Sequence, residues 1–319
     1  MKLALLSEEK ERIKTFLEKL GLKYQDQDYS FYLEDGAQII GTVSVKGNII
    51  CLFGIDPDYR GKNLAGMMLS ELINFLYEKK IYYLQVYTKP ENLEIFKGLG
   101  FSEIISTDKV SLLESSHRPI RRVLNELKQE YNIVEEDIGS AVLNANPFTY
   151  GHLFLIKEAA KRHQRFLVFV LEEDCSFFSF QDRIRLVKEG TKDLANVTVL
   201  PSTTYLVSKL TFPTYFLKED VDEVKEQALA DAHIFKNYFL PIFGIKKRYL
   251  GTEEDPVTNK YNQALGEVLK DRLEIIERIR SDEIPVSASL VRKLFLEKDY
   301  SALEKLVPKT TLEFLKNHE

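Results

Sequence analysis

The chain of 319 residues contains no tryptophan, only two cysteines and no long apolar segment. Cys51 and Cys175 form neither a Cys-x-x-Cys pair nor a disulfide framework, and each lies in or beside a strand-like apolar run, so we expect buried or bystander thiols. The apolar run at residues 1–6 is too short for a secretory signal, and no run approaches the roughly 18 residues that span a bilayer. We therefore expect a cytoplasmic protein with no membrane partner.

Strong positive charge and familiar catalytic motifs are also lacking. The formal net charge of −5 argues against a large nucleic-acid footprint, because binding to a phosphate backbone depends on clustered Lys and Arg. The five histidines form no metal-ligand spacing with one another or with the cysteines, so we expect no metal held by the protein. There is no Walker A loop, no dinucleotide Gly-x-Gly-x-x-Gly fingerprint and no Gly-x-Ser-x-Gly elbow.

A chain of this length is expected to form two domains. In the first part, Ser7 reads as the N-cap of an opening helix, and residues 46–48 read as a hairpin turn between two strands. Helices and strands then alternate up to residue 115, which predicts an α+β domain. The periodicity breaks at residues 115–119, and we place the domains at 1–115 and 116–319.

The second part alternates short apolar strands with amphipathic helices. This alternation predicts a parallel, doubly wound α/β sheet. The strands are expected at 139–143, 165–171, 197–200 and 248–250, and the helices at 151–162, 180–189, 219–237, 259–269 and 289–297.

Ligands of doubly wound sheets bind beyond the carboxyl ends of the strands, where loops enter helix N-termini. The segment after the strand at 139–143 fits this description, because polar residues lead into a helix that starts near Gly151. His152 can donate a hydrogen bond to a phosphate oxygen, and Thr149 can add a neutral donor. Gly151 removes a side chain where a nucleotide would press closest. We expect this nucleotide site to include Asn144, Asn146, Pro147, Phe148 and Gly151 as well.

Thr149-Tyr150-Gly151-His152 resembles the His/Thr-x-Gly-His signature of the nucleotidylyltransferase superfamily. A second segment, residues 286–292, resembles the late Ile-Ser-x-Ser/Thr-x-x-Arg motif of that superfamily. There, Ser287 and Ser289 would cap a helix and bind phosphate, and Arg292 would neutralise the β- and γ-phosphates of the leaving pyrophosphate. Each residue alone has an ordinary explanation as a cap or a surface side chain, but the order and placement of both motifs favour a nucleotide site.

Five strings narrow the resemblance to one family within this superfamily. Together they look like the citrate (pro-3S)-lyase ligase family, also called the citrate lyase acetylating enzyme. The strings span residues 144–152, 178–185, 211–218, 251–253 and 257–262. The resemblance adds Gly251 and Glu253 to the nucleotide-binding residues. Leu290 departs from the family pattern, which has Arg there.

The resemblance implies a reaction in which acetate, ATP and a protein-bound thiol give an acetyl thioester, AMP and pyrophosphate, with Mg²⁺ as a further requirement. The thiol would belong to a dephospho-CoA-type prosthetic group on the acyl carrier subunit of citrate lyase. His152, Thr149 and Arg292 would be the catalytic residues. Acetate suits such a site because a carboxylate is already ionised at neutral pH and needs no general base.

The first domain resembles the GNAT acetyltransferases. Its segment Arg60-Gly61-Lys62-Asn63-Leu64-Ala65 is similar to the Gln/Arg-x-x-Gly-x-Gly/Ala motif that cradles the pyrophosphate of coenzyme A. Asn63 stands where the motif has Gly, and no general base is identifiable. We therefore favour a domain that binds a CoA-like group without transferring its acyl chain.

Three alternatives and one surface hypothesis stay open. The chain could be a small-molecule adenylyltransferase with a mononucleotide or phosphopantetheine acceptor, a GNAT acetyltransferase with a nucleotide-sensing domain, or a non-catalytic adaptor. Basic clusters are either solvated faces or a docking surface for an acidic carrier protein. They comprise Arg118, Arg121 and Arg122; Lys161, Arg162 and Arg165; and Lys246, Lys247 and Arg248.

Overall fold

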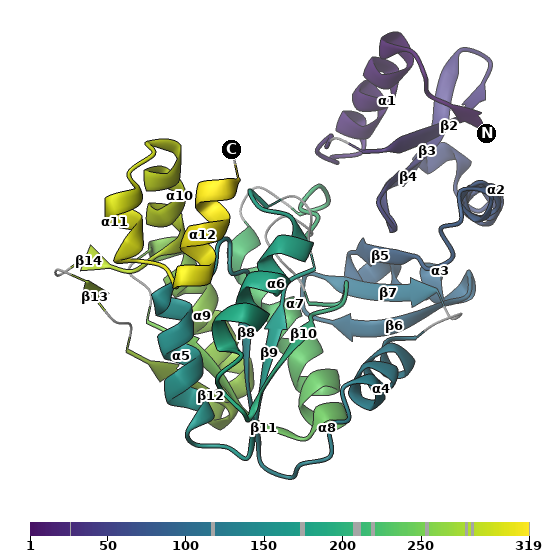
Figure 1. The fold of residues 1–319 in the computed structure, drawn as a ribbon. Coiled ribbons are helices and arrows are strands. Elements are labelled where there is room, and N and C mark those ends of the chain that lie inside the picture. The colour runs from purple at the N-terminus through teal and green to yellow at the C-terminus, as the bar shows by residue number, and fades with distance from the viewer. Residues whose placement is uncertain are drawn as a thin grey trace. The chain divides into compact units, whose positions relative to one another are not determined.

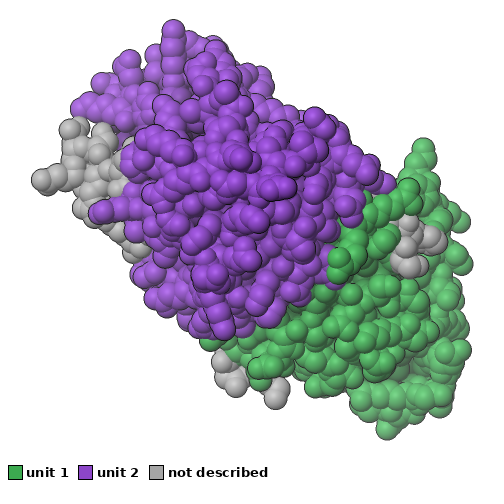
Figure 2. Space-filling view, turned by 90° about the horizontal axis from the view of Figure 1, so that it is seen from below, with its two compact units in different colours: residues 1–123, 212–226 green, residues 124–211, 227–319 purple. Residues whose placement is uncertain are grey.

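The chain forms two units in the computed structural model, which describes residues 1–25, 27–115, 119–172, 176–206, 212–217, 221–252, 255–277, 280–281 and 284–318 (Figure 1). Contacts between Cα atoms group residues 1–123 with 212–226, and residues 124–211 with 227–319 (Figure 2). The boundary predicted after residue 115 stays a prediction. Every helix in the described residues is too short or too polar to span a membrane.

The first unit is α+β, as predicted, and is built on a seven-stranded sheet in the order β1-β2-β3-β4-β5-β7-β6. β4 and β5 are parallel, and the other neighbouring strands are antiparallel. The strands are β1 (Lys2–Leu3), β2 (Tyr29–Asp35), β3 (Gln38–Lys46), β4 (Ile49–Ile55), β5 (Gln85–Thr88), β6 (Phe101–Ser106) and β7 (Ser111–Ser115). The helices are α1 (Ser7–Lys19), α2 (Leu64–Glu78) and α3 (Leu93–Gly98), with 3-10 turns η1 (Pro57–Tyr59) and η2 (Pro90–Asn92).

In the first unit the predicted hairpin turn is confirmed, whereas the predicted N-cap of the first helix is wrong. β3 and β4 are joined at Gly47 and Asn48, which confirms the predicted turn. The N-cap of α1 is Leu6, and Ser7 is already helical. The carboxylate of Glu9 accepts hydrogen bonds from the amides of Leu5 and Leu6, both at 2.8 Å, so an acidic side chain of the first turn replaces the expected serine cap. Cys51 is buried, as expected, whereas Cys175 lies outside the described residues.

A segment from the later part of the chain packs into the first unit. Tyr215 is buried there, its carbonyl accepts a hydrogen bond from the amide of Lys23 at 2.9 Å, and its hydroxyl donates to the carbonyl of Tyr87 at 3.3 Å. The Phe212 ring lies edge-on to Tyr87, with 5.7 Å between centroids. The first unit is therefore completed by residues that follow the stretch 124–211 of the second unit in sequence.

The second unit contains the predicted doubly wound sheet. Its five strands are all parallel, in the order β10-β9-β8-β11-β12. The strands are β8 (Ile138–Leu143), β9 (Arg165–Val170), β10 (Val197–Pro201), β11 (Ile245–Gly251) and β12 (Leu273–Ile276). Its helices include α5 (Tyr150–Ala160), α6 (Phe180–Thr191), α7 (Glu223–Ile234), α8 (Leu240–Phe243), α9 (Pro256–Leu269), α10 (Ala288–Leu296), α11 (Tyr300–Glu304) and α12 (Lys309–Asn317).

Five further elements complete the list of helices and strands in the described residues. They are α4 (Ile120–Glu130), which crosses the division between the units, the π-helical turn η3 (Phe235–Phe239), the 3-10 turn η4 (Lys270–Arg272) and the two-residue strands β13 (Arg280–Ser281) and β14 (Ile284–Pro285). The helix expected at 219–237 is thus α7 followed by η3, which continues into α8.

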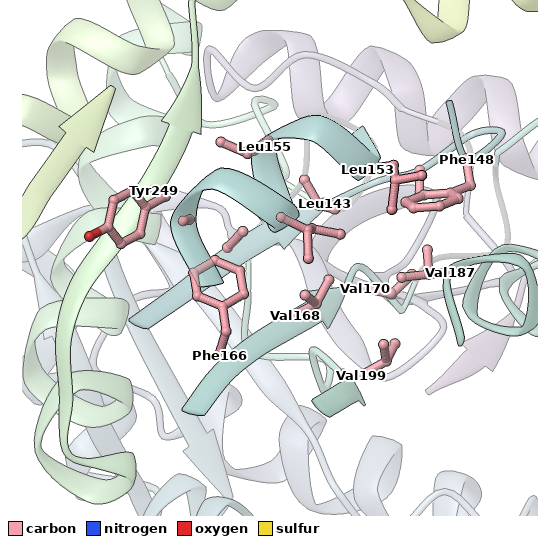
Figure 3. Packing of buried hydrophobic residues seen from close by; sticks show 14 of the residues in the cluster. Leu143, Phe148, Leu153, Leu155, Phe166, Val168, Val170, Val187, Val199 and Tyr249 are labelled. Carbon is pink, nitrogen blue, oxygen red and sulfur yellow. The ribbon is translucent and has the colours of Figure 1, made fainter. Parts of the chain in front are cut away.

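Apolar side chains cover both faces of this sheet. On one face, α5 and α6 pack against β8 and β9 in the cluster drawn in Figure 3. On the other, Phe169 of β9 lies edge-on to Phe239 and Phe243 at 5.3 and 5.4 Å. Phe148 belongs to the first cluster and is fully buried. Gly190 of α6 leaves room for the Phe148 ring, because a Cβ at Gly190 would collide with it.

We predict that Gly190→Ala destabilises the protein by about 1–3 kcal/mol, because the added methyl overpacks the contact with Phe148. A Gly→Ala substitution in the interior of a helix ordinarily raises the free energy of unfolding by about 0.5–1 kcal/mol. Gly266→Ala in α9 is the matched control, since its Cβ would meet only Leu273 at an ordinary 3.8 Å. Urea unfolding of both variants checks the opposite signs; a stabilised Gly190→Ala variant would contradict the packing.

Candidate nucleotide site

The loop between β8 and α5 orients His152. Thr149 is the N-cap of α5, and its backbone amide and hydroxyl lie 3.1 and 3.0 Å from Nδ1 of His152. A backbone amide can only donate, so Nδ1 accepts, and the proton of the neutral ring lies on Nε2. His152 therefore has a donor on the nitrogen opposite the cap. A hydrogen bond from Thr149 to phosphate stays a prediction; in the structure the contacts of Thr149 hold the imidazole in one tautomer.

A buried arginine, not expected from the sequence, holds the carboxyl ends of β8 and β9 together. Arg183 of α6 is fully buried, and its Nη1 donates to the carbonyls of Asn144 at 2.8 Å and of Leu171 at 2.9 Å. The same nitrogen donates to the side chain of Asn144 at 2.9 Å, and Nε donates to the carbonyl of Phe178 at 3.1 Å. Asn146 adds a further link, because its side-chain oxygen accepts from the amide of Phe178 at 3.1 Å. Both predicted asparagines thus shape the loop.

The two predicted motifs meet in space. Arg292 of α10 donates to the carbonyl of Asn146 at 2.5 Å. A Cβ on Gly151 would lie 2.9 Å from the carbonyl oxygen of Val286, so the glycine allows two backbones to approach. That Gly151 also makes room for a nucleotide stays a prediction, and its close neighbour within the protein is Val286. Ser287 caps α10, accepting from the amide of Leu290 at 3.2 Å.

The departure at Leu290 has a structural reason. Its side chain packs against an apolar cluster of the C-terminal helices, which includes Val291, Leu303 and Leu315. Leu290 does not line the pocket described next. The hydroxyl of Ser289 accepts from Nη2 of Arg292 at 3.2 Å, so Ser289 orients that guanidinium.

A pocket of about 640 Å³ opens at the carboxyl ends of β8 and β11. Eight of the predicted site residues line it, namely Asn144, Asn146, Thr149, Gly151, His152, Gly251, Ser287 and Arg292. The predicted residues Pro147, Phe148 and Ser289 do not line the pocket. The peptide bond between Asn146 and Pro147 is cis. The buried Phe148 ring stacks parallel to His152 at 5.9 Å, which supports the imidazole from the core side. Glu253 lies outside the described residues.

A second wall of the pocket was not predicted as part of the site. It is formed by Gln227 and Asp231 of α7, Arg248 of β11, and Tyr261 and Asn262 of α9. The prediction that Arg248 belongs to a basic cluster on the surface is wrong, because this residue is 2% exposed and its Nη1 donates to Asp231 at 2.8 Å. A signal was present for α9, because residues 257–262 form one of the strings of the family resemblance.

The two arginines of the pocket have different electrostatic surroundings. In the described part of the chain no carboxylate lies within ion-pair distance of Arg292, and its partial burial lowers its pKa. Burial also opposes the charge of Arg248, but Asp231 and Tyr261 outweigh this effect and raise its pKa. Both remain cationic at neutral pH. Among the described residues Arg292 is thus a cation without a counter-ion, a suitable environment for phosphate oxygens.

In the first unit, the predicted CoA-binding segment connects η1 to α2. Asn63 is the N-cap of α2 with φ of 56°, in the left-handed region that glycine adopts most readily, and asparagine tolerates that region better than most residues. Gly61 also has a positive φ of 79°, Arg60 follows η1, and Leu64 and Ala65 open the helix. Lys62 lies over the Tyr59 ring at 4.2 Å. A role of this segment in binding stays a prediction.

Both parts of the chain match known protein families. A family model of the citrate lyase ligase C-terminal domain matches residues 138–315, and a GNAT acetyltransferase domain model matches residues 5–111. Citrate (pro-3S)-lyase ligase from Klebsiella pneumoniae is 36% identical over 318 residues, covering 96% of this chain and 92% of the relative. The proteins of the same name from Haemophilus influenzae (35% over 315 residues; 95% and 94%) and Escherichia coli K12 (38% over 290 residues; 88% and 82%) are similarly related.

A GNAT acetyltransferase domain followed by a parallel α/β sheet that matches the citrate lyase ligase C-terminal domain defines a two-domain protein of the ligase class. The relatives make the assignment specific. The chain belongs to the citrate (pro-3S)-lyase ligase family. The resemblance, fold class and enzyme class predicted from the sequence are thereby confirmed.

Because Arg183 bonds to three backbone carbonyls at the base of the site, we predict that Arg183→Met destabilises the protein by about 3 kcal/mol. Methionine preserves bulk but leaves buried acceptors without donors. Arg185→Met, two residues along the same helix, is the control: its side chain is 54% exposed and pairs with Asp182, which predicts a change within about 1 kcal/mol. Urea denaturation measures both, and equal small effects would mean that Arg183 is dispensable for the fold.

Proposed function

We propose that this chain is an AMP-forming acid–thiol ligase, which acetylates the prosthetic-group thiol on the acyl carrier subunit of citrate lyase. The observation that carries the proposal is that His152 and Arg292, from two motifs about 140 residues apart in sequence, line one pocket in a member of this family. The substrates are acetate, ATP and the carrier thiol, and the products are the acetyl thioester, AMP and pyrophosphate.

In the first step a carboxylate oxygen of acetate attacks the α-phosphorus of ATP, and the bond to the pyrophosphate oxygen breaks. Nε2–H of His152 donates a hydrogen bond to a non-bridging oxygen of the α-phosphate, where negative charge develops. Its orientation by Thr149 means that little reorganisation is needed during the reaction. The attacking oxygen is already anionic, so no residue has to remove a proton.

Arg292 supplies positive charge for the leaving group. Its lack of a carboxylate partner in the described residues, and its hydrogen bonds to Asn146 and Ser289, leave a positioned guanidinium for the β- and γ-phosphates. Gly251, at the end of β11, and Glu253, outside the described residues, complete the nucleotide-binding set that we propose. Among the described residues no group of three or more potential ligands could hold a metal ion. Mg²⁺ would be carried mainly by the phosphates, which it neutralises when bound.

In the second step the thiolate of the carrier attacks the carbonyl carbon of the acetyl adenylate, and AMP leaves with the electrons of the broken C–O bond. We propose that the segment at residues 60–65 of the first unit binds the CoA-like prosthetic group, as the positive φ at Gly61 and Asn63 allows close backbone approach. One of the basic clusters considered for carrier docking is partly engaged within the protein, since Arg162 pairs with Glu274 and Arg165 with Glu135.

We predict that His152→Ala lowers acetate-dependent exchange of labelled pyrophosphate into ATP by about 10²–10³-fold, the usual loss when one preorganised transition-state donor is removed. The assay contains Mg²⁺ and no carrier protein, so it reports the first step alone. Lys157→Ala, on the exposed side of the same helix, is the control and should keep the native exchange rate.

Retention of more than about a tenth of the exchange by His152→Ala would rule out the role assigned to this histidine. A native protein that forms a stable dinucleotide from a phosphate-bearing acceptor, without acetate, would be a small-molecule adenylyltransferase instead. Native exchange that appears only after de-acetylated citrate lyase is added would mean that the carrier must bind first.

A further inference from the structure

The wall of the pocket formed by α7, β11 and α9 contains polar groups that have no role in the mechanism proposed above. Arg248 of β11 is buried, Asp231 bonds to its Nη1 at 2.8 Å, and the hydroxyl of Tyr261 donates to the same Asp231 oxygen at 2.8 Å. Phe235 lies 4.6 Å below the guanidinium. Helices α7 and α9 thus fix the position of one arginine side chain.

This arrangement leaves hydrogen-bonding capacity unused. Nε of Arg248 is buried without a partner, and an unsatisfied buried donor of this kind is costly enough to require an explanation. The side-chain amides of Gln227 (7% exposed) and Asn262 (9% exposed) also line this wall, and neither has a hydrogen-bond partner in the described part of the chain. Three nearly buried donor groups from three elements therefore face the same pocket.

Charge and shape identify the chemical class of ligand that fits this wall. Among the described residues that line the pocket, the permanent cations are Arg292 and Arg248. Asp231 contacts Nη1 and Nε has no partner, and the Nε–Nη2 edge has the parallel N–H bonds that bind a carboxylate in bidentate fashion. The side chain of Leu250 lies on the same face of the sheet as that of Arg248. On the neighbouring strand β8, Val142 lies two residues beyond Ser140, which is the register partner of Arg248, and it also lines the pocket. These aliphatic side chains suit a short alkyl group.

We propose that Arg248, held by Asp231 and Tyr261, binds the carboxylate of the acid substrate, and that Val142 and Leu250 limit the length of its alkyl chain. The inference rests on the proposed function and assigns its acid subsite. It places the acid on the α7–α9 side of the pocket, and leaves Arg292 and His152 to the phosphates. The carboxylate would bind through the arginine edge before one of its oxygens turns to the α-phosphorus.

The test measures the acetate and ATP dependence of pyrophosphate–ATP exchange in the native protein and in Arg248→Lys. Lysine keeps the charge beside Asp231 but loses the bidentate edge, so we expect the apparent KM for acetate to rise about 10- to 100-fold. The KM for ATP should change by less than about threefold. Lys247→Gln is the control, because this neighbouring side chain lies outside the pocket and pairs with Glu274 at 3.7 Å.

Two further variants keep the test decisive. Arg248→Met combined with Asp231→Asn removes both charges together and avoids an isolated buried carboxylate, which protects the fold if Arg248→Lys does not fold. Leu250→Ala should raise kcat/KM for propionate relative to acetate by about tenfold, an effect that a purely structural arginine–aspartate pair does not predict.

The outcomes separate this inference from the proposed function. No acetate-dependent exchange in the native protein, with or without citrate lyase, would overturn the proposed function itself. The acid subsite alone would be overturned if the native protein catalyses exchange and one of three results is obtained. The KM for acetate is unchanged in the Arg248 variants, the KM values for acetate and ATP rise equally, or the acid preference of Leu250→Ala equals that of the native protein.

Discussion

The buried guanidinium of Arg183 is the contact on which the site depends. Carbonyls at the carboxyl ends of parallel strands have no further strand residues to bond to, and here those of Asn144 and Leu171 converge on one side chain. A charged donor can satisfy several carbonyls at once, and in doing so it holds the ends of β8 and β9 at a defined separation. Without this contact the loop that leads to His152 would begin from two strand ends that are free to move apart.

From this base the loop is fixed by residues whose sequence signature suggested ligand binding. Asn144 and Asn146 bond to Arg183 and Phe178, Thr149 bonds to His152, and Gly151 lets the loop meet the backbone at Val286. A motif in such a site specifies a backbone shape as much as a set of ligand contacts. This explains why the late motif with Arg292 has to accompany the early one: each completes the geometry of the other.

The predictable features were those that depend on neighbouring residues. The strand–helix alternation, the hairpin at Gly47 and the Thr149–His152 spacing are local, and the structure contains each of them. Arg183 and Arg248 could not be placed from the sequence, because their burial depends on partners that lie in distant segments or that require the whole sheet to form. Tyr215 is a similar case: the segment reads as part of the second half, yet it is buried in the first unit.

The two arginines of the pocket reflect the chemistry that we propose. A carboxylate that attacks a triphosphate brings anions toward one another, so the site needs positive charge at two places more than it needs a base. If both cations faced the phosphates, nothing would hold the acid against that repulsion. Asp231 limits how strongly Arg248 attracts a triphosphate, because it already compensates the charge, while the remaining N–H edge still selects a planar carboxylate. The counter-ion thereby allows one pocket to distinguish two anionic substrates.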